Sequence, residues 1–197
     1  IGVMVVIVRT HLALYTTCML AGAVCWEVGN LLWLAGWPVF RITPWWISFL
    51  VLTIAAERLE LGRMVRLPKA AEPLFITAAA VLVSGNLLAL AAHDPGVRLA
   101  GAGLLATAIW LLLFDIARRT IRQPGLPRFA AACLLSGYAW LGVSGVLGMA
   151  LGGVNTGMPY DAFLHAVLVG FVMSMIFGHA PIIFPAVLRL SITFTPI

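Results

Sequence analysis

Two histidines in one apolar stretch are the residues of this sequence whose type and spacing could do chemistry. His165 and His179 lie fourteen positions apart in YDAFLHAVLVGFVMSMIFGHAPIIFPAVLR, which runs from Tyr160 to Arg189. At about 100° and 1.5 Å per residue, an α-helix would place them within roughly 40° of one face and about 21 Å apart. A neutral imidazole is a common ligand of haem iron and of copper, and ionisable groups within a membrane span indicate function. We therefore predict that His165 and His179 bind haem or, as the alternative, copper.

The composition indicates that the elements around these histidines cross a membrane. Of the 197 residues, 62% are hydrophobic and 10% are charged, which is more apolar than one soluble core can hold. Apolar runs of about twenty residues recur between short clusters rich in Pro, Gly and Arg. We predict an all-α, polytopic transmembrane helix bundle that forms a single domain over residues 1–197 and is part of a longer chain. The expected spans are residues 12–36, 45–65, 74–91, 99–117, 129–151 and 161–188.

The basic residues of the loops predict which side of the membrane each loop faces. Cytoplasmic loops hold the excess of Lys and Arg. The loops after the second and fourth spans hold most of them: Arg63, Arg66 and Lys69, then Arg118, Arg119, Arg122 and Arg128. The loops between carry Arg41, then Arg98, then no basic residue. This alternation predicts that both termini are cytoplasmic. It also explains the net charge of +5 without a nucleic-acid partner.

Polar residues of different spans fall at two common depths. Counting from the inner boundary of each span places Glu27 at the depth of His165, where a carboxylate could orient the imidazole or relay a proton. Asn30, Asn86, Ser144 and the turn residue His93 lie near that depth. Near the inner face the same count collects His11, Glu57, Glu60, Arg63, Asp115 and His179. For His165, His179 and Glu27, a hydrogen bond to a neighbouring helix remains the alternative. The run from Glu57 to Arg63 is interpreted as an ion-paired helix end.

Two families share features of this stretch. The thirteen residues between His165 and His179 resemble the spacing of the haem-binding histidine pairs of cytochrome b, and a di-haem core would pair His93 with His165 and His11 with His179. The run HAVLVGFVMSMIFGHAP, with His165, Ala166 and Gly170, resembles the His-Ala helices of NnrS-type bacterial membrane proteins. That resemblance implies a multi-pass protein of the bacterial inner membrane, with haem or copper held by His165 and a redox or nitrogen-oxide role.

Three functions are compatible with these observations. The leading hypothesis is a redox protein that transfers electrons within a respiratory or related complex, through haem or copper bound by intramembrane histidines. The main alternative is a non-catalytic accessory subunit that packs in the lipid bilayer against other membrane subunits. A transporter that uses Glu27 and Asn86 is the third. Nucleotide-binding loops, nucleophile triads and zinc-type Cys/His spacings are missing from the sequence, so a soluble-type enzyme is not expected.

Overall fold

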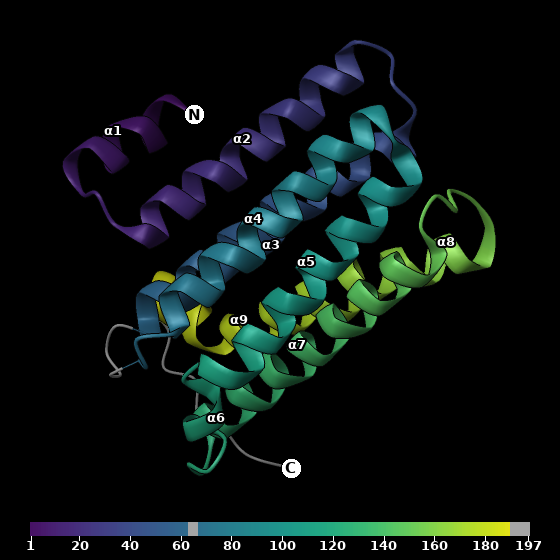
Figure 1. Ribbon diagram of the computed structural model, residues 1–197. Coiled ribbons are helices and arrows are strands. Elements are labelled where there is room, and N and C mark those ends of the chain that lie inside the picture. The colour runs from purple at the N-terminus through teal and green to yellow at the C-terminus, as the bar shows by residue number, and fades with distance from the viewer. Residues whose placement is uncertain (63–66, 190–197) are drawn as a thin grey trace.

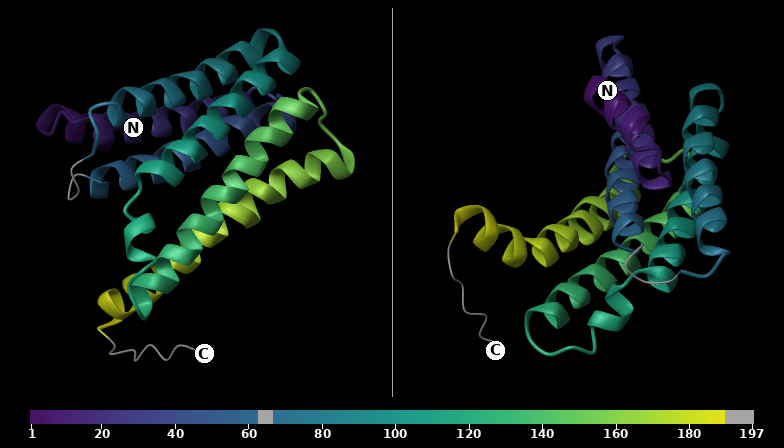
Figure 2. Two further views of the ribbon diagram at one scale, coloured as in Figure 1. Left: turned by 60° about the horizontal axis from the view of Figure 1, so that its bottom comes forward. Right: turned by 90° about the vertical axis from the view of Figure 1, so that its left-hand side faces the viewer.

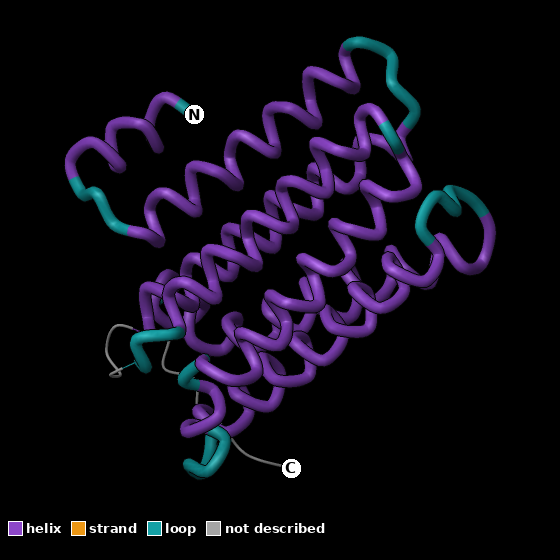
Figure 3. The backbone as a smooth tube through the Cα atoms, viewed as in Figure 1, coloured by secondary structure: helices purple, strands orange, loops and turns teal. Residues whose placement is uncertain are grey.

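The computed structural model describes residues 1–62 and 67–189, and throughout these ranges the regular structure is helical (Figures 1 and 3). The elements are α1 (Gly2–Thr10), α2 (Leu14–Leu34), α3 (Val39–Gly62), α4 (Ala71–Ala91), α5 (His93–Phe114), α6 (Ala117–Thr120), α7 (Leu126–Leu151), α8 (Gly157–His165), the π-helix η1 (Ala166–Val172) and α9 (Met173–Leu188). Six of these helical segments are long and apolar enough to cross a membrane, the sixth being α8, η1 and α9 together. The all-α polytopic prediction is confirmed.

The six long segments pack beside one another in alternating directions. Helix α2 packs against α3, α4 against α5, α5 against α7, and α7 against η1 and α9. In the right view of Figure 2, the C-terminal part of α9 (yellow) diverges from α7 (green). The bundle has an end that carries α6, called here the α6 end, and an opposite end that carries the start of α8, called the α8 end (Figure 1). Helix α2 begins and α9 finishes at the α6 end, as an even number of spans requires.

Glycines on α7 allow its backbone to approach α5 closely. A Cβ atom on Gly145 would lie 2.5 Å from the backbone nitrogen of Leu105 and 2.8 Å from the carbonyl oxygen of Gly101. On the α5 side, a Cβ on Gly101 would lie 2.7 Å from the nitrogen of Met149. Small residues let membrane helices gain van der Waals contact along their backbones. The glycine-rich face of α7 thus packs against α5. This packing fixes the position of α7, which also carries side chains near the candidate site.

Two spans begin six residues earlier in the structure than their hydropathy predicts. Helix α5 begins at His93 rather than at residue 99, because Asp94 and Arg98 pair one turn apart at 2.9 Å. Arg98 also donates to the carbonyl of Met149 at 2.6 Å and Asp94 accepts from the amide of Gly153 at 2.8 Å, so these charges join α5 to the end of α7. Helix α3 begins at Val39 rather than at residue 45, and ends in the described part at Gly62. The predicted residues Arg63 and Arg66 lie outside the described residues.

Candidate functional site

Both histidines of the last span have the same ring orientation. Nδ1 of His165 lies 2.7 Å from the carbonyl oxygen of Asp161, and Nδ1 of His179 lies 2.6 Å from that of Met175, each four residues earlier. Because a carbonyl oxygen is solely an acceptor, each Nδ1 carries the proton and donates it. The Nε2 atom of each ring therefore presents its lone pair. A metal-ligating histidine is held in the same way when its second nitrogen donates to a backbone carbonyl.

The π-helix between them directs these two rings to different surroundings. A π turn contains one residue more than an α turn, and each extra residue rotates the following side chains by about 100°. His165 and Val169, which an uninterrupted α-helix would place on one stripe with His179, are exposed on the outer surface. The side chain of His179 is 23% exposed and turns toward α3. The two histidines thus belong to two sites rather than to one.

His165 lines an apolar groove on the outer surface of the bundle. The groove has a volume of about 390 Å³ and lies between α7 and the last span, with walls formed by Trp140, Ala162, Ala166, Val169, Gly170 and Ser174. A Cβ atom on Gly170 would lie 2.5 Å from Cγ of Trp140, so the indole rests directly on this glycine. Four of the wall residues have small side chains spaced four apart. They leave a smooth surface beside the Nε2 atom of His165.

His179 instead belongs to a buried polar cluster at the α6 end, which we define as Glu57, Arg58, Asp115, Tyr138 and His179. Nη2 of Arg58 donates to Nε2 of His179 at 2.9 Å and to Oε1 of Glu57 at 2.9 Å. An arginine has no acceptor atom, so Nε2 of His179 must be the acceptor and the ring is neutral in this contact. Arg58 is 5% exposed, whereas Glu57 is 47% exposed at the rim. The lone pair of His179 is therefore occupied by a protein group.

Two further members of the cluster come from α5 and α7. Asp115 follows the last residue of α5, is 4% exposed and accepts from the amide of Ala117 at 2.6 Å through Oδ1. Burial raises the pKa of the Asp115 carboxyl, while the bond from Ala117 and the charge of Arg58 oppose that rise. Tyr138 is fully buried. Nε of Arg58 is buried and has no hydrogen-bond partner among the described residues. The hydroxyl of Tyr138 and the carboxyl of Asp115 are buried together and interact with each other, although without regular hydrogen-bond geometry. Four helices thus bring ionisable groups to one buried region.

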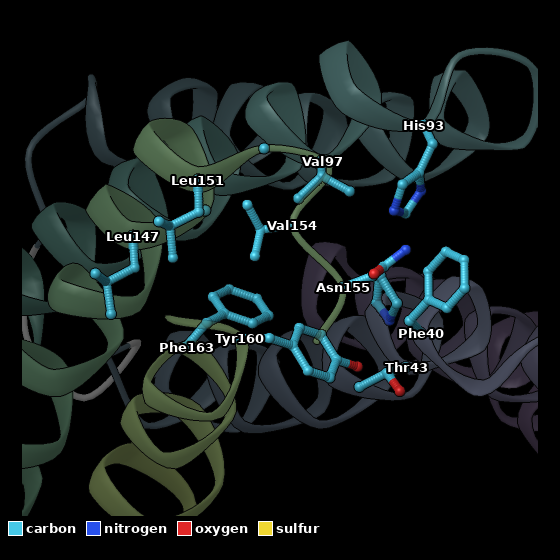
Figure 4. A pocket seen from close by; sticks show the side chains of 13 residues that line it. Phe40, Thr43, His93, Val97, Leu147, Leu151, Val154, Asn155, Tyr160 and Phe163 are labelled. Atoms are coloured by element: carbon cyan, nitrogen blue, oxygen red, sulfur yellow. The ribbon is translucent and has the colours of Figure 1, made fainter. Parts of the chain in front are cut away.

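His93 lies at the α8 end, inside the bundle. Its ring meets the ring of Phe40 edge-on at 5.2 Å, and its Nδ1 is buried with no hydrogen-bond partner in the described ranges. It lines a partly open, largely apolar cavity of about 20 Å³ together with Thr43, Tyr160 and Phe163 (Figure 4). That volume suits one water molecule and no larger group. The structure does not bring His93 into the groove of His165.

The remaining predicted site residues, His11 and Glu27, lie apart from both histidines of the last span. His11 follows α1 and is exposed. Glu27 is exposed on α2, which packs against α3 and α1, whereas His165 lies beside α7. Neither a hydrogen bond nor an ion pair joins Glu27 to His165 in the described part of the chain. Within residues 1–62 and 67–189, no three His, Cys, Asp or Glu side chains gather as they would around a metal ion.

Arg58, Tyr138 and Trp140 are the site residues that sequence reasoning did not assign. Arg58 lies within the run that was interpreted as an ion-paired helix end, and its ion pair with Glu57 agrees with that interpretation. Arg58 is buried against His179 because of the face that α3 turns toward α9. Counting residues along a span gives the depth of a residue in the membrane and does not give this face. Tyr138 and Trp140 are two residues apart on α7, and one is buried while the other is 47% exposed. An aromatic residue in an apolar span gives no sequence signal for either role.

Comparison with known families gives one match that extends over the whole chain. Residues 1–197 match the family model described as a domain of unknown function, DUF8744. The chain belongs to the DUF8744 family. No curated protein and no solved structure matches it. For this DUF8744 chain, the groove of His165 and the buried cluster around Arg58 are therefore interpreted from their chemistry alone.

Proposed function

We propose that this protein is a membrane redox protein that binds haem through His165 in the groove beside Trp140. The observation that carries the proposal is the orientation of His165. Its Nδ1–H is bonded to the carbonyl of Asp161, and its Nε2 lone pair is left for a ligand at an apolar surface. A single proximal histidine is sufficient to hold haem iron, as in globins and peroxidases.

The groove suits a flat apolar group better than it suits a bare metal ion. Its walls are Trp140 and the small side chains of Ala162, Ala166 and Gly170, which offer van der Waals contact to a planar ring. Copper bound by several protein side chains is less well supported, since the described residues hold no cluster of three ligands. His179 is not available as the second ligand in this conformation, because Arg58 donates to its Nε2.

Haem bound here would supply one-electron redox chemistry, and the protein residues would determine its position and surroundings. The bond from His165 to Asp161 fixes the ring and its tautomer. The apolar walls exclude water from one side of the groove. The other side is open, so a neighbouring membrane subunit would complete the site and receive or deliver the electron. Haem binding and assembly into a larger complex, which the leading hypothesis from the sequence combines, are thus compatible at this surface.

The same groove also favours the second candidate, a non-catalytic accessory subunit. Trp140 is 47% exposed and Val169 is 57% exposed on this face. An apolar face with small residues is also the surface on which another membrane helix packs. In that case His165 would bond a polar group of the neighbouring helix, and no pigment would be present.

The deciding experiment is an optical spectrum of the full chain, purified in mild detergent from cells supplied with haem precursor. We expect a Soret band that His165→Ala abolishes. The matched control is His11→Ala, because His11 is also exposed but lies outside both sites; this variant should keep the band. Wild-type protein without a Soret band, or a His165→Ala variant that retains it in full, would refute haem binding at His165. Loss of co-purifying subunits in His165→Ala, with no pigment in the wild type, would favour the accessory subunit.

A further inference from the structure

An arginine-lined pocket lies at the α6 end, apart from both histidines. Its volume is about 510 Å³. It lies between the segment that leads into α4, the end of α5 and helix α6, and its lining includes Leu67, Leu113, Phe114, Arg118, Arg119 and Arg122. Figure 1 shows α6 as a short helix at the extreme end of the bundle, next to the end of α5. The pocket is thus at the level where membrane-spanning helices meet the lipid headgroups.

The charges of this pocket favour an anion. Among the described residues that line it, three are arginines and one, Asp115, is acidic, so their formal charges sum to +2. Asp115 is 4% exposed and its Oδ1 is bonded to the amide of Ala117. The side chains of Arg119 and Arg122 are exposed and have no hydrogen-bond or ion-pair partner within the described ranges. Their N–H groups are therefore free to bind a ligand.

Arg118 provides a fixed edge for the pocket. Its Nη1 donates to the carbonyl oxygen of Leu113 at 2.8 Å, one of the carbonyls that the end of α5 leaves without a helical partner. A guanidinium group has five N–H donors in a planar fork that matches the oxygens of a phosphate. One bond to Leu113 therefore leaves donors for a ligand and holds the group in place. Arg118 would position a phosphate, while Arg119 and Arg122 add charge.

The apolar part of the pocket indicates where the phosphate comes from. Leu113 is 50% exposed on the last turn of α5 and lies next to Phe114 and Leu67 on the pocket wall. A free phosphate ion gains nothing from apolar neighbours, whereas a phospholipid places its acyl chains beside them. Basic pockets between transmembrane helices bind the headgroups of anionic lipids in this way. We propose that the pocket formed by Arg118, Arg119 and Arg122 binds the phosphate of an anionic membrane phospholipid.

The test compares lipid retention by the full chain and its variants. Wild-type protein is reconstituted into nanodiscs of phosphatidylcholine with a minor fraction of phosphatidylglycerol, extracted, and analysed for retained lipid by native mass spectrometry. The test variant is Arg119→Gln/Arg122→Gln. The matched control is Arg9→Gln/Arg128→Gln, which removes the same charge from two exposed arginines that do not line the pocket. A direct hydrogen bond contributes about 1 kcal/mol, or about fivefold, so losing one such bond to the phosphate at each of the two arginines should reduce selective retention about 25-fold. The control should lose much less.

Each outcome decides for or against the proposal. Selective retention by the wild type that falls in the test variant and persists in the control supports it. Equal losses in both variants would show general surface attraction and overturn it. Inorganic phosphate that displaces phosphatidylglycerol at millimolar concentration would overturn the lipid as the ligand. If the test variant does not fold, the wild type still decides the question: its melting temperature should rise in phosphatidylglycerol over phosphatidylcholine, and an equal melting temperature in both lipids would overturn the proposal.

Discussion

The substitution Gly145→Ala is expected to separate α7 from α5 and to destabilise the protein. The added Cβ would lie 2.5 Å from the nitrogen of Leu105 and 2.8 Å from both its Cα and the carbonyl oxygen of Gly101. Ordinary contacts of a Cβ atom begin at 3.4 Å, so the nearest one is 0.9 Å too short. All three atoms belong to the backbone of α5, so no side chain can rotate away. Overpacking of this kind costs about 1–3 kcal/mol, and we expect the upper half of that range.

A matched control lies three residues earlier on the same helix. A Cβ on Gly142 would lie 3.7 Å from Cβ of Ala108 and 3.9 Å from Cδ1 of Leu105, which are ordinary contacts. Alanine is the better helix former by up to about 1 kcal/mol. Gly142→Ala should therefore be neutral or stabilising. The two variants have the same change in composition and differ in the space available at the substituted position.

The measurement is the free energy of unfolding of each variant, from a denaturant titration followed by circular dichroism in detergent micelles. We expect Gly145→Ala to unfold at lower denaturant than the wild type, and Gly142→Ala at the same or higher. Helix α7 also carries Tyr138 and Trp140, so a shift of α7 should weaken haem binding in Gly145→Ala alone. If Gly145→Ala is as stable as Gly142→Ala, the close approach of α5 and α7 in this structure is refuted.

Two further predictions concern buried polar groups. Burial raises the pKa of Asp115 in the folded protein, so its contribution to stability is greatest below the unfolded pKa of about 4 and is lost as the pH rises through the folded pKa. Asp115→Asn should therefore gain stability over the wild type as the pH rises from about 4 to 7, measured by melting temperature; parallel curves would contradict this. Asn86 donates to Oγ of Ser48 at 2.7 Å and to the carbonyl of Pro44 at 3.3 Å. At about 0.6 kcal/mol for each such bond, Asn86→Ala should cost about 1–2 kcal/mol of unfolding free energy, whereas Thr77→Ala, on the exposed face of α4, should cost less.

The fold could be predicted from the sequence because hydropathy and length report directly on membrane spans. Six spans were expected, and the described residues contain six helical segments that are long and apolar enough to cross a membrane. The start of α5 at His93 was not predicted, because Asp94, Pro95 and Gly96 are typical of a turn. In the structure, these residues instead connect α5 to its neighbours. The charged Asp94 accepts a hydrogen bond from the amide of Gly153, and the small Gly96 lets the α5 backbone pack against that of Ala89 on α4.

The candidate site could be predicted only by depth. Counting residues placed Glu57, Asp115 and His179 at one level, and the structure brings all three into the cluster around Arg58. The same counting placed Glu27 at the level of His165, yet these residues lie on helices that do not pack together. Depth follows from the rise per residue, which is nearly constant. Which helices are neighbours follows from the packing of side chains, which a single sequence does not reveal.

The π-helix explains why two histidines of one helix can have different environments. With regular α geometry, His179 would share the exposed face of His165, and Arg58 would lose the acceptor that α9 provides. Since the extra residue in the π turn rotates α9, Nε2 of His179 faces the guanidinium of Arg58 at 2.9 Å. This acceptor is neutral, so the charge of Arg58 is balanced by Glu57 at the exposed rim and by Asp115 at longer range in the interior. The attraction to Arg58 is, in turn, one of the forces that keep the Asp115 carboxylate stable at 4% exposure. The buried cluster thus depends on the rotation of α9, and the same rotation leaves His165 alone at the apolar groove.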